Sequence, residues 1–98
     1  REYEKGSKEL PIAHLYMGNI YYQQGNIEKA ESAYRRAIRE TNDPRGYNNL
    51  AWLYFTQGIR LDEAEKLARK AVESVPDNVD FKDTLEKIVE KRRQGAPG

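Results

Sequence analysis

Few side chains in this sequence could support catalysis. His14 is the sole histidine, Asp62 and Glu63 are adjacent acids, and the chain contains no cysteine. Adjacent residues of a helix point to different faces, so a capping role explains Asp62 better than acid–base catalysis. No glycine-rich phosphate loop, metal-ligand spacing or nucleophile elbow is present. The sequence therefore predicts no catalytic residue, no metal site and no cofactor.

Composition excludes several further classes of function. The 98 residues include 17 basic and 16 acidic side chains, which leaves a net charge of +1. A nucleic-acid-binding protein needs a clustered positive excess, and the basic clusters here alternate with acids along the expected helices. We therefore expect no nucleic-acid partner. The absence of cysteine rules out disulfides and Cys-ligated zinc, and it leaves the redox compartment unreadable.

No stretch of the chain approaches the run of about 20 apolar residues that spans a bilayer. Membrane insertion is therefore not expected. The sequence starts at Arg1 without a methionine. We interpret it as a processed product or an excerpt of a longer protein, and the sequence does not indicate its localisation.

The chain repeats itself with a period of about 33 residues. The segment 18–25, GNIYYQQG, aligns with 51–58, AWLYFTQG, and the match resumes downstream after one inserted residue. In both copies a small residue is followed three positions later by tyrosine, and both copies end in Gln-Gly. A period in this range is typical of a solenoid, in which each unit buries its apolar face against its neighbours.

Helix breakers divide the chain into five expected helices. Pro11 suits the first turn of one helix, Asn26 caps a second, and Asp43 with Pro44 opens a third. Asp62 with Glu65 has the spacing of a capping box and is expected to open the fourth. The segment 76–78 ends that helix and caps a fifth, which residues 95–98 bring to a stop. No segment alternates with a period of two, so no sheet is expected.

These residues resemble the tetratricopeptide repeat, a helix-turn-helix unit of about 34 residues. That unit favours a bulky residue at position 4, an aliphatic at 7, a small residue at 8, an aromatic at 11, alanine at 20, an aromatic at 24, alanine at 27 and proline at 32. The first copy offers His14, Met17, Gly18, Tyr21, Ala30, Tyr34, Ala37 and Asn42; the second offers Tyr47, Leu50, Ala51, Tyr54, Ala64, Ala68, Ala71 and Pro76. His14, Asn42 and Ala68 depart from the pattern, and His14 is expected to be a packed or partly exposed side chain.

The resemblance implies an all-α fold, a right-handed α–α superhelix of about five antiparallel helices. We assign residues 11–43 to the first repeat, 44–78 to the second, 79–94 to a capping helix and 95–98 to a C-terminal tail. Residues 1–10 fit either a linker or the tail of a preceding helix. The fifth helix is expected to turn Phe81, Leu85, Ile88 and Val89 inward and to cover Leu67, Ala71 and Val75.

In this family the first helices of successive repeats line a concave groove that receives a peptide or a partner's helix. The resemblance assigns ten groove residues here: Ile12, Leu15, Asn19, Tyr22, Gln23, Arg45, Asn48, Asn49, Trp52 and Phe55. Tyr16 and Thr56 occupy further groove positions, and the fifth helix adds Asp80, Asp83, Thr84, Lys87, Glu90 and Lys91. Amides can hold a peptide backbone, and aromatic residues anchor interfaces. The alternative is that these aromatics only pack between helices and that the amides only pin neighbouring groups.

Chaperone-binding members of the family grip an acidic C-terminus with a clamp of cations and amides. This chain has the amides, Asn19 and Asn49, but Leu15, Asp80 and Thr84 stand where the cations belong. A carboxylate terminus would be held poorly, so we reject that clamp. The leading hypothesis is a non-enzymatic module that binds a peptide or protein partner in the groove. The alternative is a structural spacer, or a self-association segment, of a longer repeat protein.

Overall fold

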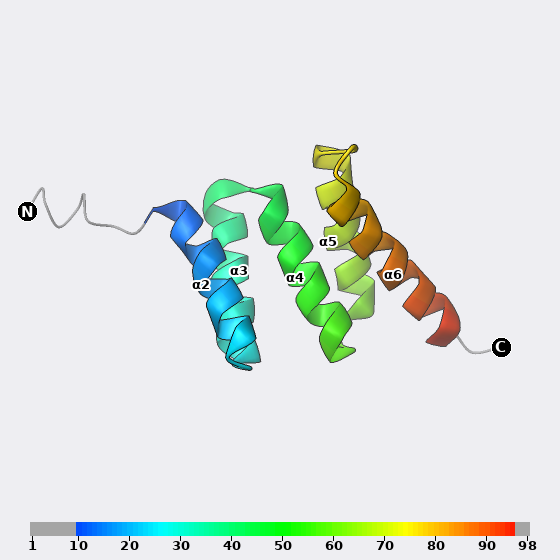
Figure 1. Cartoon of the computed structure of the whole chain (residues 1–98), viewed down its shortest axis with the longest axis horizontal. Coiled ribbons are helices and arrows are strands. Elements are labelled where there is room, and N and C mark those ends of the chain that lie inside the picture. Colours follow the sequence, from blue (N-terminus) through cyan, green and yellow to red (C-terminus); the bar gives the residue numbers. More distant parts are fainter. Residues whose placement is uncertain (1–9, 96–98) are drawn as a thin grey trace, which may run out of the picture.

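A computed structural model describes residues 10–95 of the chain. Five helices follow one another: α2 (Pro11–Gln23), α3 (Ile27–Thr41), α4 (Pro44–Gln57), α5 (Leu61–Ser74) and α6 (Val79–Gly95) (Figure 1). The described part contains no strand. The all-α prediction is confirmed, whereas the assignments for residues 1–9 and 96–98 lie outside the described residues.

Side-chain caps begin three of the helices where the sequence predicted them. The Lys29 amide donates to Asn26 Oδ1 at 3.3 Å, and the Phe81 amide donates to Asn78 Oδ1 at 2.9 Å. Asp43 Oδ1 accepts from the Arg45 amide at 2.9 Å, while the Arg45 guanidinium closes an ion pair with the same carboxylate. Each cap satisfies an amide that the first turn of a helix leaves without an internal partner.

The expected capping box at Asp62 and Glu65 is wrong. Gly58 and Arg60 both adopt positive φ angles, +69° and +48°, and this turn brings the helix start forward to Leu61. Asp62 therefore lies inside the first turn, where its carboxylate accepts from the Glu63 amide at 2.8 Å. Glu65 instead holds Arg69 and Arg92, each at 2.7 Å.

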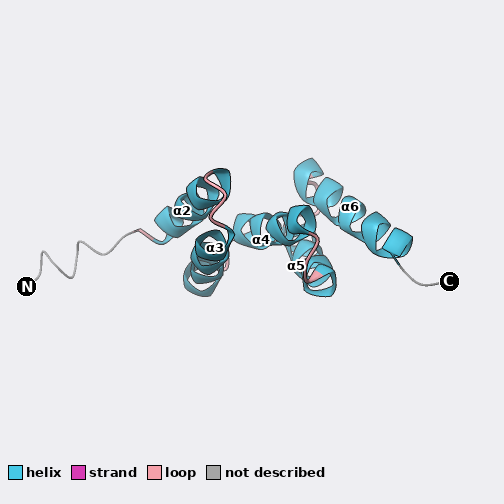
Figure 2. Ribbon diagram, turned by 90° about the horizontal axis from the view of Figure 1, so that it is seen from below, coloured by secondary structure: helices cyan, strands magenta, loops and turns pink. Residues whose placement is uncertain are grey.

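The helices form two layers. Seen along the groove, α4 is recessed between α2 and α6, and α3 and α5 lie behind them (Figure 2). The helices of each hairpin, α2 with α3 and α4 with α5, pack against each other, and α3 contacts α4 while α5 contacts α6. The first helices of the units thus line a concave face, and the second helices form the back.

Small residues allow the second helices to pack closely against the first ones. Ala30 and Ala37 in α3, with Ala64, Ala68 and Ala71 in α5, are at most 1% exposed. Small side chains of this kind let two helix axes approach each other. The bulk of the core is supplied mainly by the first helices, with α6 contributing the last layer, and its largest fully buried side chains are Tyr54, Leu50, Leu53 and Ile88.

The face that α6 buries overlaps with the expected one at Phe81 and Ile88 and is turned toward Thr84. Phe81, Thr84 and Ile88 are buried, whereas Leu85 and Val89 are only half-buried. Thr84, expected in the groove, is 5% exposed and donates its hydroxyl to the Asp80 carbonyl oxygen. No second helix of a third unit follows α6 in the described chain, so its contacts come only from α4 and α5. Val75, expected beneath α6, is 39% exposed.

Polar side chains join the two repeats at the back of the molecule. The Tyr54 hydroxyl is fully buried at the start of this network and donates to Glu31 Oε2 at 2.5 Å, while Arg35 donates to the Tyr54 hydroxyl. Arg35 also bonds to Glu31 at 3.3 Å and to Glu63 of α5 at 3.0 Å. The hydrogen bond from Tyr54, aided by Arg35, lowers the pKa of Glu31 despite its partial burial.

This network predicts an acid-sensitive stability. Because the folded-state pKa of Glu31 lies below its ordinary value of 4.5, the stabilisation is present above that pH and is lost as pH falls through the lowered value. We expect the midpoint temperature of thermal unfolding to decrease as the pH is lowered from 5 to 3. In Tyr54→Phe this decrease should be less steep. Tyr22→Phe, which loses a hydroxyl bonded to Thr56 and not to a carboxylate, is the matched control. Identical pH slopes in Tyr54→Phe and the unmodified chain would contradict the assignment.

Candidate peptide-binding groove

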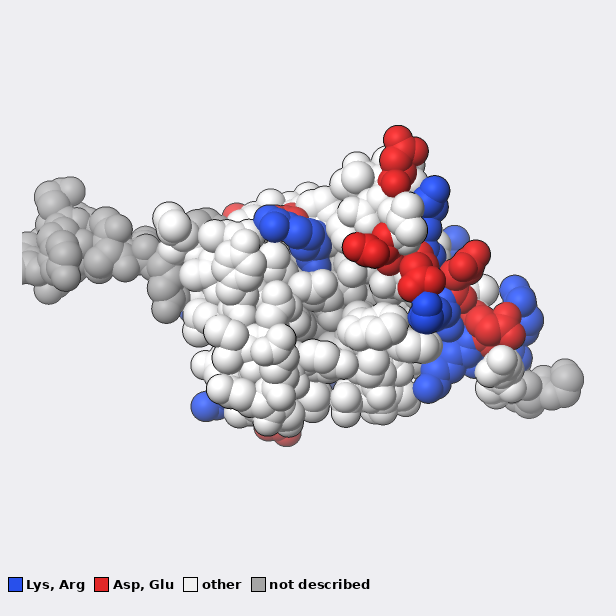
Figure 3. Space-filling view, in the orientation of Figure 1, with Lys and Arg blue, Asp and Glu red and all other residues white. Residues whose placement is uncertain are grey.

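The concave face of α2 and α4 carries little charge. Figure 3 shows this face, with mostly uncharged residues over α2 and α4, one basic patch near the start of α4, and acids and bases gathered over α6. Two large apolar side chains of α2 lie open to solvent, Tyr16 at 53% and Ile20 at 51% exposure. An uncharged concave surface between helices is a common setting for ligand binding.

An amide pair bridges α2 and α4 on this face. Asn19 Oδ1 accepts two hydrogen bonds, from Asn49 Nδ2 at 3.1 Å and from the Tyr34 hydroxyl at 2.6 Å. Within residues 10–95, no hydrogen bond engages Asn19 Nδ2 or Asn49 Oδ1. The pair therefore presents one donor and one acceptor side by side, the complement of a peptide group.

Tyr34 fixes the orientation of this pair. Its ring is 3% exposed, and burial raises the pKa of the hydroxyl to about 12. The hydroxyl therefore stays protonated at neutral pH and donates a hydrogen bond to Asn19 Oδ1. This bond turns the Asn19 oxygen toward α3. The amide nitrogen of Asn19 takes no part in that bond.

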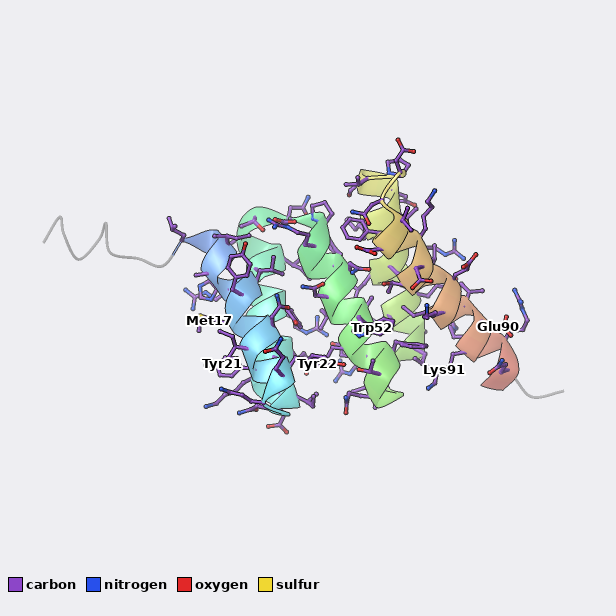
Figure 4. The ribbon with its side chains drawn as sticks, viewed as in Figure 1. Met17, Tyr21, Tyr22, Trp52, Glu90 and Lys91 are labelled. Carbon is purple, nitrogen blue, oxygen red and sulfur yellow. The ribbon has the colours of Figure 1, made fainter. Side chains whose placement is uncertain are left out.

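A hollow of about 280 Å³ lies beside the amide pair. It is lined by Asn19, Tyr22, Gln23, Tyr34, Asn49 and Trp52, and we refer to these residues as the hollow. The Tyr22 hydroxyl donates to Thr56 Oγ1 at 3.0 Å and so ties the ends of α2 and α4 together. Figure 4 shows Tyr22 on the side of α2 that faces α4, and Tyr21 on the opposite side. The hollow has room for one large side chain.

Aromatic residues continue the groove from the hollow toward α6. The rings of Trp52 and Phe55 lie 5.1 Å apart between centroids, tilted by 35°. The ammonium of Lys91 lies over the Phe55 ring, 5.2 Å from its centroid. The groove thus passes from uncharged amides on α2 and α4 to a cation on α6.

The family profile of the tetratricopeptide repeat matches residues 15–79, which is more than half of the chain. The chain belongs to the tetratricopeptide repeat family. The repeat is generally a non-catalytic fold that mediates protein–protein interactions. The concave face described above is built from the first helices of the two tetratricopeptide repeats and α6.

The sequence is similar to that of the response regulator aspartate phosphatase E of Bacillus subtilis (strain 168). The two sequences are 35% identical over 87 residues, which cover 83% of this chain and 22% of the relative. The chain thus spans about a fifth of the length of this tetratricopeptide-repeat relative.

The tetratricopeptide-repeat geometry brings together five of the ten groove residues expected from the sequence. Asn19, Tyr22, Gln23, Asn49 and Trp52 all line the hollow.

The other five expected residues lie outside the hollow. Leu15 is 2% exposed within the core, so its assignment to the groove is wrong: its side chain packs between helices. Ile12 and Phe55 are half-buried against the core, and Arg45 is exposed and held by Asp43. Asn48 is half-buried, and its Oδ1 atom is shielded from solvent without a partner in the described part of the chain.

Sequence reasoning missed one member of the hollow, Tyr34. It was expected only to fill space between helices, because its unit position is an aromatic core position of the tetratricopeptide repeat. The ring does fill that space, and the hydroxyl reaches past it to Asn19. The signal was available in the residue type, because a buried tyrosine hydroxyl needs a hydrogen-bond partner and phenylalanine would not.

No group of three or more histidine, aspartate and glutamate side chains within residues 10–95 could hold a metal ion. No helix of the same range is long and apolar enough to cross a bilayer.

Proposed function

We propose that this chain binds an extended segment of a protein partner along its concave groove, as the tetratricopeptide repeat fold and the chemistry of its face suggest. One observation carries the proposal. Asn19 and Asn49 are joined by a hydrogen bond, and their remaining donor and acceptor, Asn19 Nδ2 and Asn49 Oδ1, are used by no group within residues 10–95. Such a pair can bond the N–H and the C=O of a peptide backbone at once.

The hollow supplies the second element of recognition. A side chain of the bound segment enters beside Trp52 and Tyr22, where it is removed from water against aromatic surfaces. Buried aromatic anchors dominate the energy of many interfaces, whereas surrounding contacts contribute little. Backbone bonds at the amide pair then set the direction of the segment, and the hollow selects the side chain that it places there.

The test is a selection of random 12-residue peptides displayed against the chain, followed by affinity measurements with the enriched peptides. Trp52→Ala and Asn49→Ala are each expected to weaken binding at least tenfold, a loss typical of interface hot spots. Thermal unfolding must first show that each variant folds. Tyr22→Ala should weaken binding, whereas Tyr21→Ala, which changes the adjacent tyrosine on the other side of α2, should leave it unchanged. Enriched peptides indifferent to both Trp52 and Asn49 would contradict the groove assignment.

Self-association is a second candidate function, favoured by the exposure of Tyr16 and Ile20 on α2. Sedimentation equilibrium over a hundredfold range of concentration distinguishes it. A mass that stays at the monomer value of 11.4 kDa would rule it out.

The relative's name describes an enzyme that acts on an aspartate of a response regulator. For this chain we propose only that a response regulator is a partner worth testing by the same affinity measurement. The phosphatase activity belongs to a protein of which this chain spans 22%.

A further inference from the structure

Lys91 stands at the boundary between the groove and the charged surface of α6. Figure 4 shows Lys91 on the side of α6 that faces α4 and Trp52, with Glu90 on the opposite side. Its ammonium lies 5.2 Å from the centroid of the Phe55 ring, and that ring lies 5.1 Å from Trp52. Lys91 is therefore linked to the hollow through the tilted ring pair of Phe55 and Trp52.

The charge of Lys91 has no anionic partner in the described chain. The other cations in the last turns of α6 each hold a carboxylate: Lys87 with Asp83 at 2.6 Å, Arg92 with Glu65 at 2.7 Å and Arg93 with Glu90 at 3.0 Å. Among residues 10–95, the ammonium of Lys91 forms no ion pair or hydrogen bond and lies over the face of the Phe55 ring. A lysine kept over a ring in a groove, while its neighbours are neutralised, is available to a ligand's negative charge.

We propose that the segment bound in the groove carries an acidic side chain, which pairs with Lys91, close in sequence to the apolar side chain that enters the hollow. This inference rests on the proposed function and names the chemistry of the partner. The ammonium of Lys91 lies within about 10 Å of the Trp52 ring centroid, the sum of the two distances above. Because an extended chain advances about 3.3–3.6 Å per residue, this span corresponds to about three positions between the acid and the anchor. Aspartate and glutamate both satisfy the requirement.

The acids of α6 do not reverse this preference. Asp83 and Glu90 are already neutralised by Lys87 and Arg93. Glu86 is exposed and lies five residues before Lys91, which at 3.6 residues per turn is about 140° round the helix from it. Asp80 lies eleven residues before Lys91, which on a helix is about 16 Å away at 1.5 Å per residue. The field at the Phe55 end of the groove is therefore set by Lys91.

The experiment uses the random 12-residue peptide library and the full 98-residue chain. Peptides enriched on the unmodified chain are expected to carry aspartate or glutamate within three positions of an apolar residue. The strongest binder is then synthesised with that acid and with its amide counterpart. At low salt, Lys91→Met should lower the affinity for the acidic peptide about three- to fivefold, as expected for an exposed ion pair. The affinity for the amide peptide should be unchanged. Higher salt should reduce the difference.

Lys82→Met is the matched control. Lys82 also lies on α6, but nine residues from Lys91, which places the two on opposite faces of the helix. Its replacement should leave both affinities unchanged. A second selection on Lys91→Glu should enrich lysine or arginine in place of the acid, because a reversed charge reverses the complementarity.

The outcomes separate this inference from the function on which it depends. Peptides that need Trp52 and Asn49, but show no acidic preference and no response to Lys91, would overturn this inference alone. Equal losses in Lys82→Met and Lys91→Met would overturn it as well, because the effect would then follow the net charge. If no enriched peptide depends on Trp52 or Asn49, the proposed function fails and the inference fails with it.

Discussion

A chain that ends at Asn78, and so lacks α6, is expected to lose its cooperative unfolding transition. Phe81 is 5% exposed in a cluster with Tyr47 and Ala71, and Ile88 is fully buried in the main core. Removing one such side chain typically costs about 2–5 kcal/mol, whereas a whole domain is stable by only about 5–15 kcal/mol. Loss of both, together with the surface they cover, leaves too little to hold α4 and α5. Circular dichroism at 222 nm during heating measures the transition.

A point substitution tests the same role without shortening the chain. Ile88→Ala should lower the free energy of unfolding by about 2–5 kcal/mol, because it leaves a cavity in the core. In a domain of this size that corresponds to a fall of at least about 8 °C in the unfolding midpoint. Glu86→Ala, on the exposed face of the same helix, should change stability by less than about 0.5 kcal/mol. A truncated chain that unfolds at the same temperature as the full chain would show that α6 contributes no stability.

Local signals were enough to predict the helices. Proline, glycine and a capping side chain act within a few residues, so the starts of α2, α3, α4 and α6 could be identified from the sequence. The start of α5 could not, because it depends on the left-handed conformations of Gly58 and Arg60. Asp62 and Glu65 have the spacing of a capping box, but that turn places both of them inside the helix.

The groove was predicted less well than the helices. The position of a residue within the repeat predicts the direction of its side chain. This prediction holds for a helix that has neighbouring helices on both sides. Leu15 is in the core, and α6, which has neighbours on one side only, buries Thr84 where a groove residue was expected. Five expected residues do share the hollow, because they lie on the neighbouring first helices α2 and α4, which contact each other.

Gly18 packs directly against the ring of Tyr34. We therefore expect one methyl group added at Gly18 to have a large effect on stability. A Cβ atom at Gly18 would lie 2.4 Å from Tyr34 Cε1 and 2.5 Å from Cδ1, so the ring would have to move. Gly18→Ala is therefore expected to lower the free energy of unfolding by about 1–3 kcal/mol, the usual cost of overpacking, although alanine favours a helix. Urea unfolding measures the change. Gly95→Ala, where an added Cβ meets nothing within 4 Å, is the matched control.

A double-mutant cycle assigns that cost to the ring. In a Tyr34→Ala background the added methyl group meets no ring, so Gly18→Ala should become neutral or stabilising by up to about 1 kcal/mol. The same loss in both backgrounds would place the strain elsewhere. The cycle also bears on the groove, because the Tyr34 hydroxyl orients Asn19. A displaced ring would break that bond and free the Asn19 amide to rotate. Gly18→Ala should therefore weaken the binding of a groove peptide even at temperatures where the variant is fully folded.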